Sequence, residues 1–487
     1  MKKMRILSLI LALVMLCSVF LVACGGEEEQ QGGGAGNLII DEESEDASKK
    51  YDAEVKNLNG HEFRFVVRNS STIGLTTHEV YAEAPNGDKI NDAVYARNAQ
   101  LQEKYNCTIK EDRTSKPHTA LKEPLTAGEY IADYVFTGVY DLRTLAQSNL
   151  CADLTNVKTI NLSKAWWDAN GFYGMNIAGK TFFVNGDGCT LDDRACWIMY
   201  FNKGYVAEYT SKNLYKEVDE GRWTIDLMYE IMEGTWKDVD GDGQMTHTDV
   251  YGYGAHTFMQ GALALQYGMG QFITEFDKNG DPQLVLNSDR MAQIVGKIDQ
   301  LSKSPEFHLG TGNAEKADIT LFKEGRLMFL SAIFMQTDLN MREMKDEYGV
   351  LPHPKLDESQ EQYYTVINTQ CYMYSVPITV KDQERSTVLF EAYSYEGYKT
   401  VYPGFYELAL KAKYSHDDVS AQIYDLIMKG RIVDFGFVFG TGAGMRDIIS
   451  NLVSAGSLDF ASAYASKEAA TKQAYADIMD AFAKLQK

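Results

Sequence analysis

Hydrophobic and polar positions along the chain follow two periods, and together they predict a mixed α/β protein. Apolar residues occupy alternate positions in His61–Arg68 (HEFRFVVR), which predicts a strand. Within Asp92–Tyr105, apolar residues such as Val94 and Leu101 recur at helical spacing, which predicts an amphipathic helix. Cys107–Lys110 then returns to a strand pattern. A strand, a helix and a strand in this order indicate a βαβ unit with a parallel sheet.

Further short apolar runs predict more strands before a helical C-terminal part. Asp133–Phe136 (DYVF) is typical of a buried strand that ends at Thr137 and Gly138. The other predicted strands are Lys180–Val184 and Trp197–Phe201, which we expect to pair around the loop between them, and Tyr348–Leu351 and Tyr372–Val376. After Asp382 the pattern is mostly helical. Ligands of parallel sheets bind at the carboxyl ends of strands, so Thr137–Tyr140 is a candidate ligand loop.

The N-terminus has the pattern of an export signal. Positively charged residues precede an uncharged apolar run from Ile6 to Val22, and Leu21-Val22-Ala23-Cys24 resembles the lipobox of bacterial lipoprotein precursors. In those precursors the signal is removed and the cysteine carries lipid. We therefore expect residues 1–23 to be a signal peptide and Cys24 to be the lipidation site, with an uncleaved membrane anchor as the alternative. In both cases the rest of the chain lies at the extracellular face of the cell membrane.

Composition separates a tether from a folded body. Residues 24–50 are rich in glycine and acidic residues, and they cannot bury enough apolar surface to fold. The folded part begins near Tyr51, and its roughly 430 residues are too many for one ordinary core, so we expect two lobes. The net charge of −21 argues against nucleic acid as a partner. The chain contains 30 Tyr and 5 Trp, whose rings stack on CH-rich ligands, although most of them serve the core or the surface.

The cysteines do not form a disulfide framework. Five remain when Cys17 leaves with the signal and Cys24 carries lipid: Cys107, Cys151, Cys189, Cys196 and Cys371. An odd number at scattered spacing is not typical of stapled folds. Cys189 and Cys196 are close enough in sequence to pair across a hairpin, and buried free thiols are equally consistent with their spacing.

Residues 238–249 (DVDGDGQMTHTD) have the ligand spacing of a calcium-binding loop. Carboxylates stand at positions 1, 3 and 5, and Gly243 stands at position 6, where the chain must turn sharply. The predicted ligands are Asp238, Asp240, Asp242, the carbonyl of Gln244, Thr246 and Asp249, the last in place of the usual Glu. Three carboxylates this close repel one another without a cation. We therefore predict a structural Ca²⁺, with an acidic surface turn as the alternative. A second stretch, DKNGD at 277–281, lacks downstream ligands and predicts a hairpin turn.

Six segments resemble, in the same order, motifs of the maltose-binding type of extracellular solute-binding protein. They are NDAVYARNAQLQEKYN (Asn91–Asn106), DYVFTGVYDLRTLAQSNLCADL (Asp133–Leu154), MYFNKGYVAEY (Met199–Tyr209), RWTIDLMYEI (Arg222–Ile231), FKEGRLMFL (Phe322–Leu330) and YGVLPHPK (Tyr348–Lys355). Together they span much of residues 55–460. On these motifs the chain resembles extracellular solute-binding protein family 1, the substrate-binding lipoproteins of ABC transporters.

The resemblance implies an α/β protein with the type II periplasmic-binding fold, in which hinge strands join two lobes around a ligand cleft. It places lobe 1 at residues 51–200, with about 368–400 returning to it, and lobe 2 at 201–367, with about 401–487 as a helical C-terminal part. It also implies that the protein binds a carbohydrate or oligosaccharide and delivers it to the permease of an ABC importer. Closure of the lobes over the ligand is then the functional event.

The family's ligand loops correspond to three places in this chain. After the DYVF strand come Thr137, Tyr140 and Asp141, of which Tyr140 would stack on a sugar ring and Asp141 would accept hydrogen bonds from hydroxyls. Thr137 stands where the family's sugar binders often have Trp. The resemblance also implies His256 and Phe258 after the YGYG strand, and Ser331 and Phe334 after FKEGRLMFL, with Trp166, Trp167 and Trp197 as further candidates of which Trp197 is expected to pack in the core.

Motifs of enzymes are scarce, so we do not expect an enzyme. The sequence contains neither GxSxG nor HExxH, and the Gly-rich stretch at 434–445 lacks the GK[ST] of a phosphate loop. Two alternatives stay open. One is a surface glycan-binding or sensory lipoprotein without transport. The other is a glycan-degrading enzyme, because a pair of catalytic carboxylates has no recognisable sequence spacing.

Overall fold

The predicted strand–helix–strand unit is present in the computed structural model of the protein. β1 (His61–Arg68) and β2 (Cys107–Thr114) pair in parallel over their full lengths, and α3 (Lys89–Tyr105) connects them. Asp88 caps the start of this helix by accepting hydrogen bonds from two backbone N–H groups of the first turn. At the other end Asn106 has a left-handed backbone with φ of 49°, which turns the chain directly into β2. Local signals therefore define both ends of the unit.

The structure describes residues 48–69, 78–168, 173–255, 258–308, 315–342, 344–368, 371–411, 418–440 and 444–485. Within these ranges the side chains of residues 258–260, 315–317, 407–411 and 418–420 are outside the description. Ser48–Lys487 form one compact unit. The predicted signal peptide, Cys24 and nearly all of the predicted tether lie outside the described residues.

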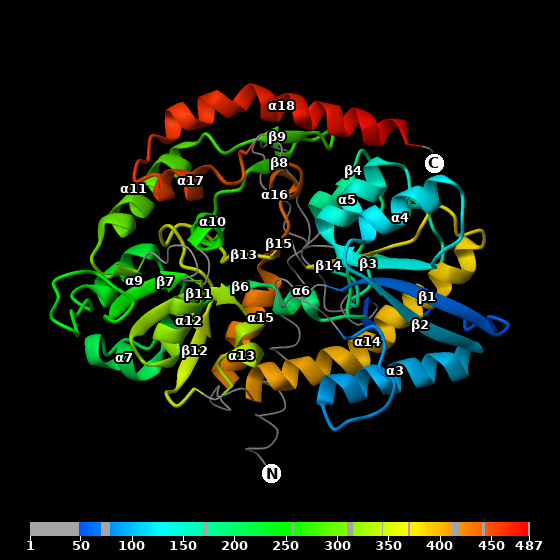
Figure 1. The fold of residues 1–487 in the computed structure, drawn as a ribbon, viewed down its shortest axis with the longest axis horizontal. Helices are drawn as coiled ribbons and strands as arrows, with labels where there is room; N and C mark the ends of the chain where they lie inside the picture. Colours follow the sequence, from blue (N-terminus) through cyan, green and yellow to red (C-terminus); the bar gives the residue numbers. More distant parts are fainter. Residues whose placement is uncertain are drawn as a thin grey trace, which may run out of the picture. The chain divides into compact units, whose positions relative to one another are not determined.

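Four strands form the first sheet, in the order β14–β3–β1–β2 (Figure 1). β3 (Tyr134–Gly138) pairs with β1 in parallel, and β14 (Tyr372–Ser375) pairs with β3 in antiparallel orientation. The strands predicted at Asp133–Phe136 and Tyr372–Val376 are thus confirmed. β14 returns to this sheet from late in the chain, and the following α14 (Gln383–Lys411) packs against α3.

Five strands form the second sheet, in the order β10–β7–β11–β6–β12. They are β6 (Trp197–Asn202), β7 (Tyr251–Ala255), β10 (Phe307–His308), β11 (Leu327–Ile333) and β12 (Tyr348–Leu351). β7 runs parallel to both β10 and β11, whereas β6 runs antiparallel to both β11 and β12. The strand predicted at Tyr348–Leu351 is confirmed.

The predicted pairing of Lys180–Val184 with Trp197–Phe201 is wrong. β5 (Lys180–Thr181) pairs with β4 (Asn176–Ile177), and β6 lies inside the second sheet between β11 and β12. α6 (Leu191–Arg194) separates the two runs. Every residue of β6 is buried, because strands flank it on both sides. Neighbouring apolar runs suggested a hairpin, but the partners of β6 lie far away in sequence.

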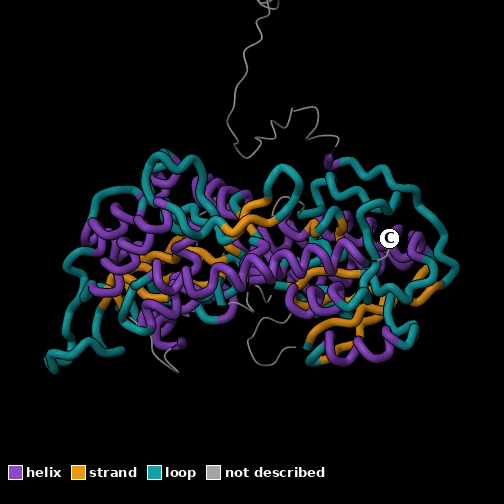
Figure 2. The backbone as a smooth tube through the Cα atoms, turned by 90° about the horizontal axis from the view of Figure 1, so that it is seen from above, coloured by secondary structure: helices purple, strands orange, loops and turns teal. Residues whose placement is uncertain are grey.

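Helices lie beside the strands of both sheets (Figure 2). In the first half of the chain they include α4 (Pro117–Thr126), α5 (Val139–Gln147), α7 (Lys203–Tyr209), α8 (Leu214–Asp219) and α9 (Ile225–Met232). Next come α10 (Phe258–Gly268), α11 (Asp289–Lys303), α12 (Glu315–Lys323) and α13 (Gln336–Leu339). After α14 the chain forms α15 (Asp418–Lys429), α16 (Phe435–Phe439), α17 (Ile448–Ser454) and α18 (Phe460–Lys484), which confirms the predicted helical C-terminal part.

A hairpin and the last helix lie close together (Figure 1). β8 (Thr274–Phe276) and β9 (Pro282–Leu284) pair around the DKNGD turn, as predicted. α18 contacts β9, α17 and α5. Its C-terminal end is capped by Lys180, whose Nζ donates to the carbonyl oxygens of Phe482 at 3.1 Å and Ala483 at 3.4 Å. A cation at this position satisfies carbonyls that lack partners within the helix and complements the helix dipole.

The five cysteines of the folded body are buried free thiols, so of the two alternatives for Cys189 and Cys196 the unpaired state is the one present. Burial raises the pKa of Cys107 and of Cys151 to about 12, which keeps both as unreactive thiols near neutral pH. Among the helices of the described residues, none combines the length and the apolar character needed to cross a membrane.

Candidate ligand-binding cavity and calcium loop

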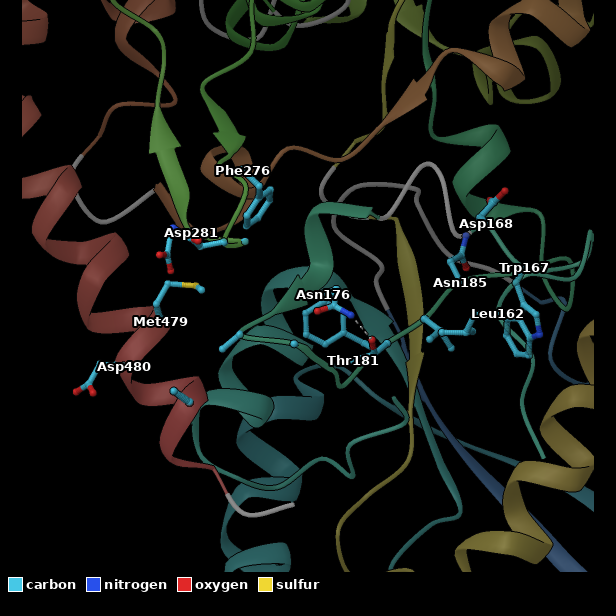
Figure 3. Close-up of a pocket in the computed structure, with 17 residues that line it drawn as sticks. Leu162, Trp167, Asp168, Asn176, Thr181, Asn185, Phe276, Asp281, Met479 and Asp480 are labelled. Carbon is cyan, nitrogen blue, oxygen red and sulfur yellow. Dashed lines mark hydrogen bonds between the residues drawn. The ribbon is translucent and has the colours of Figure 1, made fainter. Parts of the chain in front are cut away.

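A cavity of about 880 Å³ lies where the β4–β5 segment, the β8–β9 hairpin and the end of α18 meet (Figure 3). Trp167 and Asn185 lie on one side of it, and Phe276, Asp281 and Met479 lie on the other. The volume falls within the usual range for pockets that bind small molecules, roughly 300–1,000 Å³. The wall combines aromatic rings with amides and carboxylates, which suits a ligand that has both CH-rich faces and hydroxyl groups.

Asn185 lines this cavity, and its side-chain amide is buried. Among the described lining residues, no other side-chain amide is buried with both its oxygen and its nitrogen unpaired. Asn185 is 3% exposed, and neither Oδ1 nor Nδ2 has a hydrogen-bond partner among the described residues. Its backbone carbonyl accepts from the N–H of Asp168 at 3.1 Å, which fixes the residue beside the cavity. A buried polar group without a partner costs about 1–3 kcal/mol. A hydroxyl group that both donates and accepts would recover this cost.

Trp167 is held in place by a buried carboxylate of α14. Its indole Nε1 donates to Oε2 of Glu391 at 2.9 Å, and the neighbouring Trp166 donates to Oε1 at 3.0 Å. Oε2 also accepts from the backbone N–H of Asn161 at 3.1 Å. Burial raises the pKa of Glu391 to about 7 despite these three donors. Both oxygens are occupied, so the Trp167 ring has a fixed orientation at the cavity wall.

Phe276 on the opposite wall depends on a second buried carboxylate. Asp434 accepts from the backbone N–H groups of Ile273 at 2.7 Å and Gly436 at 2.6 Å, which ties the hairpin to the start of α16. The hydroxyl of Tyr267 donates to the same carboxylate at 2.9 Å. Burial raises the pKa of Asp434 to about 6. The Phe276 ring itself packs edge-to-face on Phe435 with centroids 5.6 Å apart.

Asp168 connects the cavity to a buried ionic cluster. Its carboxylate accepts from Nη2 of Arg431, whose Nη1 donates to Oδ2 of Asp192 at 2.9 Å and also to Asp193. Asp192 and Asp193 belong to α6, and burial raises the pKa of Asp193 to about 7. One guanidinium therefore serves three carboxylates, and Asp168 is the member that also lines the cavity.

Three of the predicted ligand residues lie together at the end of β3 and the start of α5. Thr137 is fully buried and donates to Oδ2 of Asp141 at 2.7 Å. The same carboxylate interacts with the ring of His118. Tyr140 is half-buried on α5, and its hydroxyl accepts from Arg446. None of the three is among the described residues that line the cavity, and their role as ligands stays a prediction.

The other predicted ligand residues belong to the second sheet or follow it. Ser331 on β11 is fully buried, with Oγ 2.8 Å from Nε2 of His353. Phe334 is 2% exposed, and its ring lies 5.8 Å from that of Tyr424. His256 and the side chain of Phe258 lie outside the described residues.

Several cavity residues were not predicted as ligands. Trp167 was a candidate and lines the cavity, whereas Trp166 and Trp197 are buried at 0% and 2% exposure. Asn185 follows the apolar run FFV as a polar residue, which was the only local signal for it. Phe276 was recognised only as part of a hairpin next to the DKNGD turn.

The predicted calcium loop brings three carboxylates together. Oxygens of Asp238, Asp240 and Asp242 all lie within 4.8 Å of one another, at the surface. Oδ1 of Asp238 accepts from the N–H of Gly241 at 2.7 Å, and Oδ2 accepts from Gly243 at 2.9 Å. Both glycines have positive φ, 75° and 73°, so the tight curl of the loop requires residues without a Cβ. These three residues suit a hard divalent cation.

The remaining predicted calcium ligands have other partners. Asp249 is fully buried, and its two oxygens accept from the backbone N–H groups of Val239 at 3.0 Å and Thr246 at 2.8 Å. It therefore closes the loop. The hydroxyl of Thr248, and not that of Thr246, donates to Oδ2 of Asp240 at 2.8 Å. Gln244 donates its backbone N–H to Asp242 at 2.7 Å, and its carbonyl as a calcium ligand stays a prediction.

No family model matches this sequence, and no curated protein matches it. Solved structures do. The GacH receptor of Streptomyces glaucescens, studied in complex with acarbose, is 12% identical with a TM-score of 0.51 over 88% of this chain and 98% of its own. A cyclo/maltodextrin-binding protein complexed with maltotetraose is 14% identical with a TM-score of 0.54 over 86% of this chain and 96% of its own. The chain therefore has the type II periplasmic-binding fold of maltose-binding-type proteins, as predicted.

Proposed function

We propose that this protein binds an extracellular oligosaccharide in the cavity of Figure 3 and delivers it to the permease of an ABC importer. The observation that carries the proposal is the Asn185 amide, which is buried at the cavity with neither end hydrogen-bonded to a described residue. The fold supports the same function, because the two similar structures were solved with acarbose and maltotetraose.

The wall chemistry suits a sugar. The apolar face of a pyranose ring packs well on aromatic rings such as Trp167 and Phe276, while its hydroxyls need amide and carboxylate partners. Asn185 supplies an amide and Asp168 a carboxylate on the same side of the cavity. In this arrangement Glu391 acts as a positioning residue, because it orients Trp167 without lining the cavity.

We also propose that Cys24 carries the lipid anchor and that residues 24–50 hold the body away from the membrane. The sequence at 21–24 supports the anchor, and the glycine-rich acidic composition supports the tether. Mass spectrometry of the mature protein tests this directly. We expect its first residue to be a lipid-modified Cys24, and an unmodified or different N-terminus would contradict the assignment.

The calcium site is proposed as structural. The carboxylates of Asp238, Asp240 and Asp242 face one another at the surface and repel without a cation. A bound Ca²⁺ would neutralise them and fix the loop, which Arg326 already ties down by donating to the carbonyl oxygens of His247 at 2.8 Å and Asp249 at 3.0 Å.

A thermal-shift screen of the full-length protein against neutral oligosaccharides tests the proposed function. A ligand at 100 times its Kd stabilises the folded state by about 2.7 kcal/mol and raises its melting temperature. Asn185→Leu should remove that shift, because it replaces both polar ends of the amide. Asn451→Leu, on the exposed face of α17, is the matched control and should keep it. A sugar whose binding is unaffected by Asn185→Leu would contradict the site.

Transport is tested separately in cells. Deletion of the gene should abolish uptake of the sugar that the screen identifies, and restored expression should recover it. Undiminished uptake would instead favour a sensory or glycan-holding lipoprotein.

A further inference from the structure

We infer that the cavity of Figure 3 selects its occupant by charge: it admits neutral or amine-bearing glycans and rejects glycans that carry uronate, phosphate or sulfate. The inference rests on the proposed function, because it names the class of ligand for the same site. It concerns the electrostatic potential of the cavity, which can be measured without knowing the sugar.

The ionisable groups of the wall all have the same sign. Asp168, Asp281 and Asp480 line the cavity, and no lysine, arginine or histidine is among the described residues that do. Figure 3 shows Asp281 and Asp480 near Met479 on one side and Asp168 beside Asn185 on the other. The side chain of Asp480 is 63% exposed and that of Asp168 is 20% exposed, so one carboxylate is open to solvent and the other is largely covered.

Two nearby cations pair with wall carboxylates, a third caps α18, and Lys278 is exposed at the turn of the β8–β9 hairpin. Arg431 is shared by Asp168 and the two carboxylates of α6. Lys484 pairs with Asp480, in a surface pair that solvent screens. Lys180 is next to the lining residues Gly179 and Thr181, but its Nζ donates to the backbone carbonyls at the end of α18.

An anionic ligand would therefore lose water and find no cation among the described lining residues. A carboxylate transferred from water needs charge-assisted hydrogen bonds to offset the loss, and wall carboxylates repel it instead. A neutral sugar meets no such cost, because its hydroxyls donate to the wall carboxylates and both donate to and accept from the Asn185 amide. An amine would gain from the same negative potential.

The test places a reactive thiol inside the cavity and measures which reagent charge enters. Met479→Cys in the full-length protein puts a half-buried cysteine on the cavity wall, while the five native cysteines of the body are buried. The rate at which this cysteine reacts is measured with two methanethiosulfonate reagents, one with a trimethylammonium group and one with a sulfonate group. Each rate is divided by the rate of the same reagent with a small free thiol, which removes the intrinsic difference in reactivity between the reagents. The wild-type chain gives the background. We expect the cationic reagent to be favoured by at least about fivefold at low salt.

Two controls separate cavity charge from the net charge of the protein. Ala469→Cys places a thiol on an exposed part of the same helix, where Lys467, Glu468 and Lys472 are all close in sequence, and should show a much smaller preference. Asp281→Asn combined with Asp480→Asn should lower the preference at Met479→Cys, as should 1 M salt. Equal rates for the two reagents, or faster reaction of the sulfonate, would overturn the inference. If a sugar binds in the thermal-shift screen but the two reagents react at equal rates, the proposed function stands and the charge selection fails. If the cationic reagent reacts faster but no sugar binds, only the proposed function fails.

Discussion

Trp167 and Glu391 are joined by a hydrogen bond of 2.9 Å from the indole Nε1 to Oε2, inside the body and directly behind the cavity wall. The same carboxylate receives the indole of Trp166. Glu391 is 2% exposed, and burial raises its pKa to about 7 from the ordinary value of 4.5. A group that orients a cavity aromatic therefore titrates close to neutral pH.

This pKa predicts how stability depends on pH. Between about pH 4.5 and 7 the folded state binds a proton at Glu391 that the unfolded state has released, so the free energy of unfolding falls as pH rises through this window. Asp193 and Asp434 act in the same direction, with pKa values raised to about 7 and about 6. We expect urea denaturation to show greater stability at pH 5 than at pH 7.5.

Glu391→Gln should make this pH dependence shallower by about one proton, because the amide does not titrate. The slope lost is up to about 1.4 kcal/mol per pH unit. Glu384→Gln is the matched control, since Glu384 is exposed on the same helix and its side chain is 65% accessible. An unchanged slope in Glu391→Gln would show that Glu391 ionises as an ordinary carboxyl.

The end of β3 offers a second prediction. If Tyr140 and Asp141 contact the sugar, Tyr140→Phe and Asp141→Asn should each weaken binding by roughly tenfold, equal to about 1.4 kcal/mol. The conservative changes are chosen because Asp141 accepts from Thr137, and full removal would leave a buried donor without a partner. Isothermal titration with the sugar from the screen measures the effect, with circular dichroism to confirm folding. Unchanged affinity in both variants would assign binding to the Asn185 cavity alone.

Calcium removal should lower the melting temperature of the wild-type protein. Binding of Ca²⁺ to the folded loop stabilises that state by mass action, and a chelator reverses it. Asp240→Asn should reduce the chelator effect, because Asp240 is one of the three carboxylates that meet in the loop. Asp277→Asn, in the hairpin turn, is the matched control and should respond to chelator as the wild type does. A melting temperature that does not change with chelator would leave the loop as an acidic surface turn.

The sequence was most informative where local order decides structure. The β1–α3–β2 unit was predicted correctly because the hydrophobic periods of its two strands and its helix lie within the unit, whereas the Asp88 cap and the Asn106 turn were recognised only in the structure. β6 was assigned the wrong partner because it pairs with β11 and β12, whose sequences say nothing about Trp197–Asn202. The type of secondary structure that a segment forms is encoded in its own sequence. The choice of which distant strand it pairs with depends instead on how much apolar surface the whole sheet buries.

The cavity was harder to predict for the same reason. Asn185 lies in the wall of a cavity whose opposite wall comes from the β8–β9 hairpin and α18, which are far from it in sequence, and neither end of its amide has a partner among the described residues. No local pattern distinguishes this asparagine from others in the chain. The type II fold, in contrast, was recognised from the order of six short motifs, since that order reflects how both sheets are assembled.

The attachment of α18 gives the last prediction. Lys180 is 8% exposed, and its Nζ donates to the final backbone carbonyls of α18. This helix carries Met479 and Asp480, which line the cavity. Lys180→Met keeps the length of the side chain but removes the cation, which should cost about 1–2 kcal/mol of stability. Hydrogen exchange should rise in the last turns of α18 and remain unchanged in α3, because only the cap is lost. Lys472→Met, an exposed change on the same helix, should leave exchange unaffected. Equal protection of the last turns in Lys180→Met and wild type would show that packing on α5 and β9 alone holds the helix end.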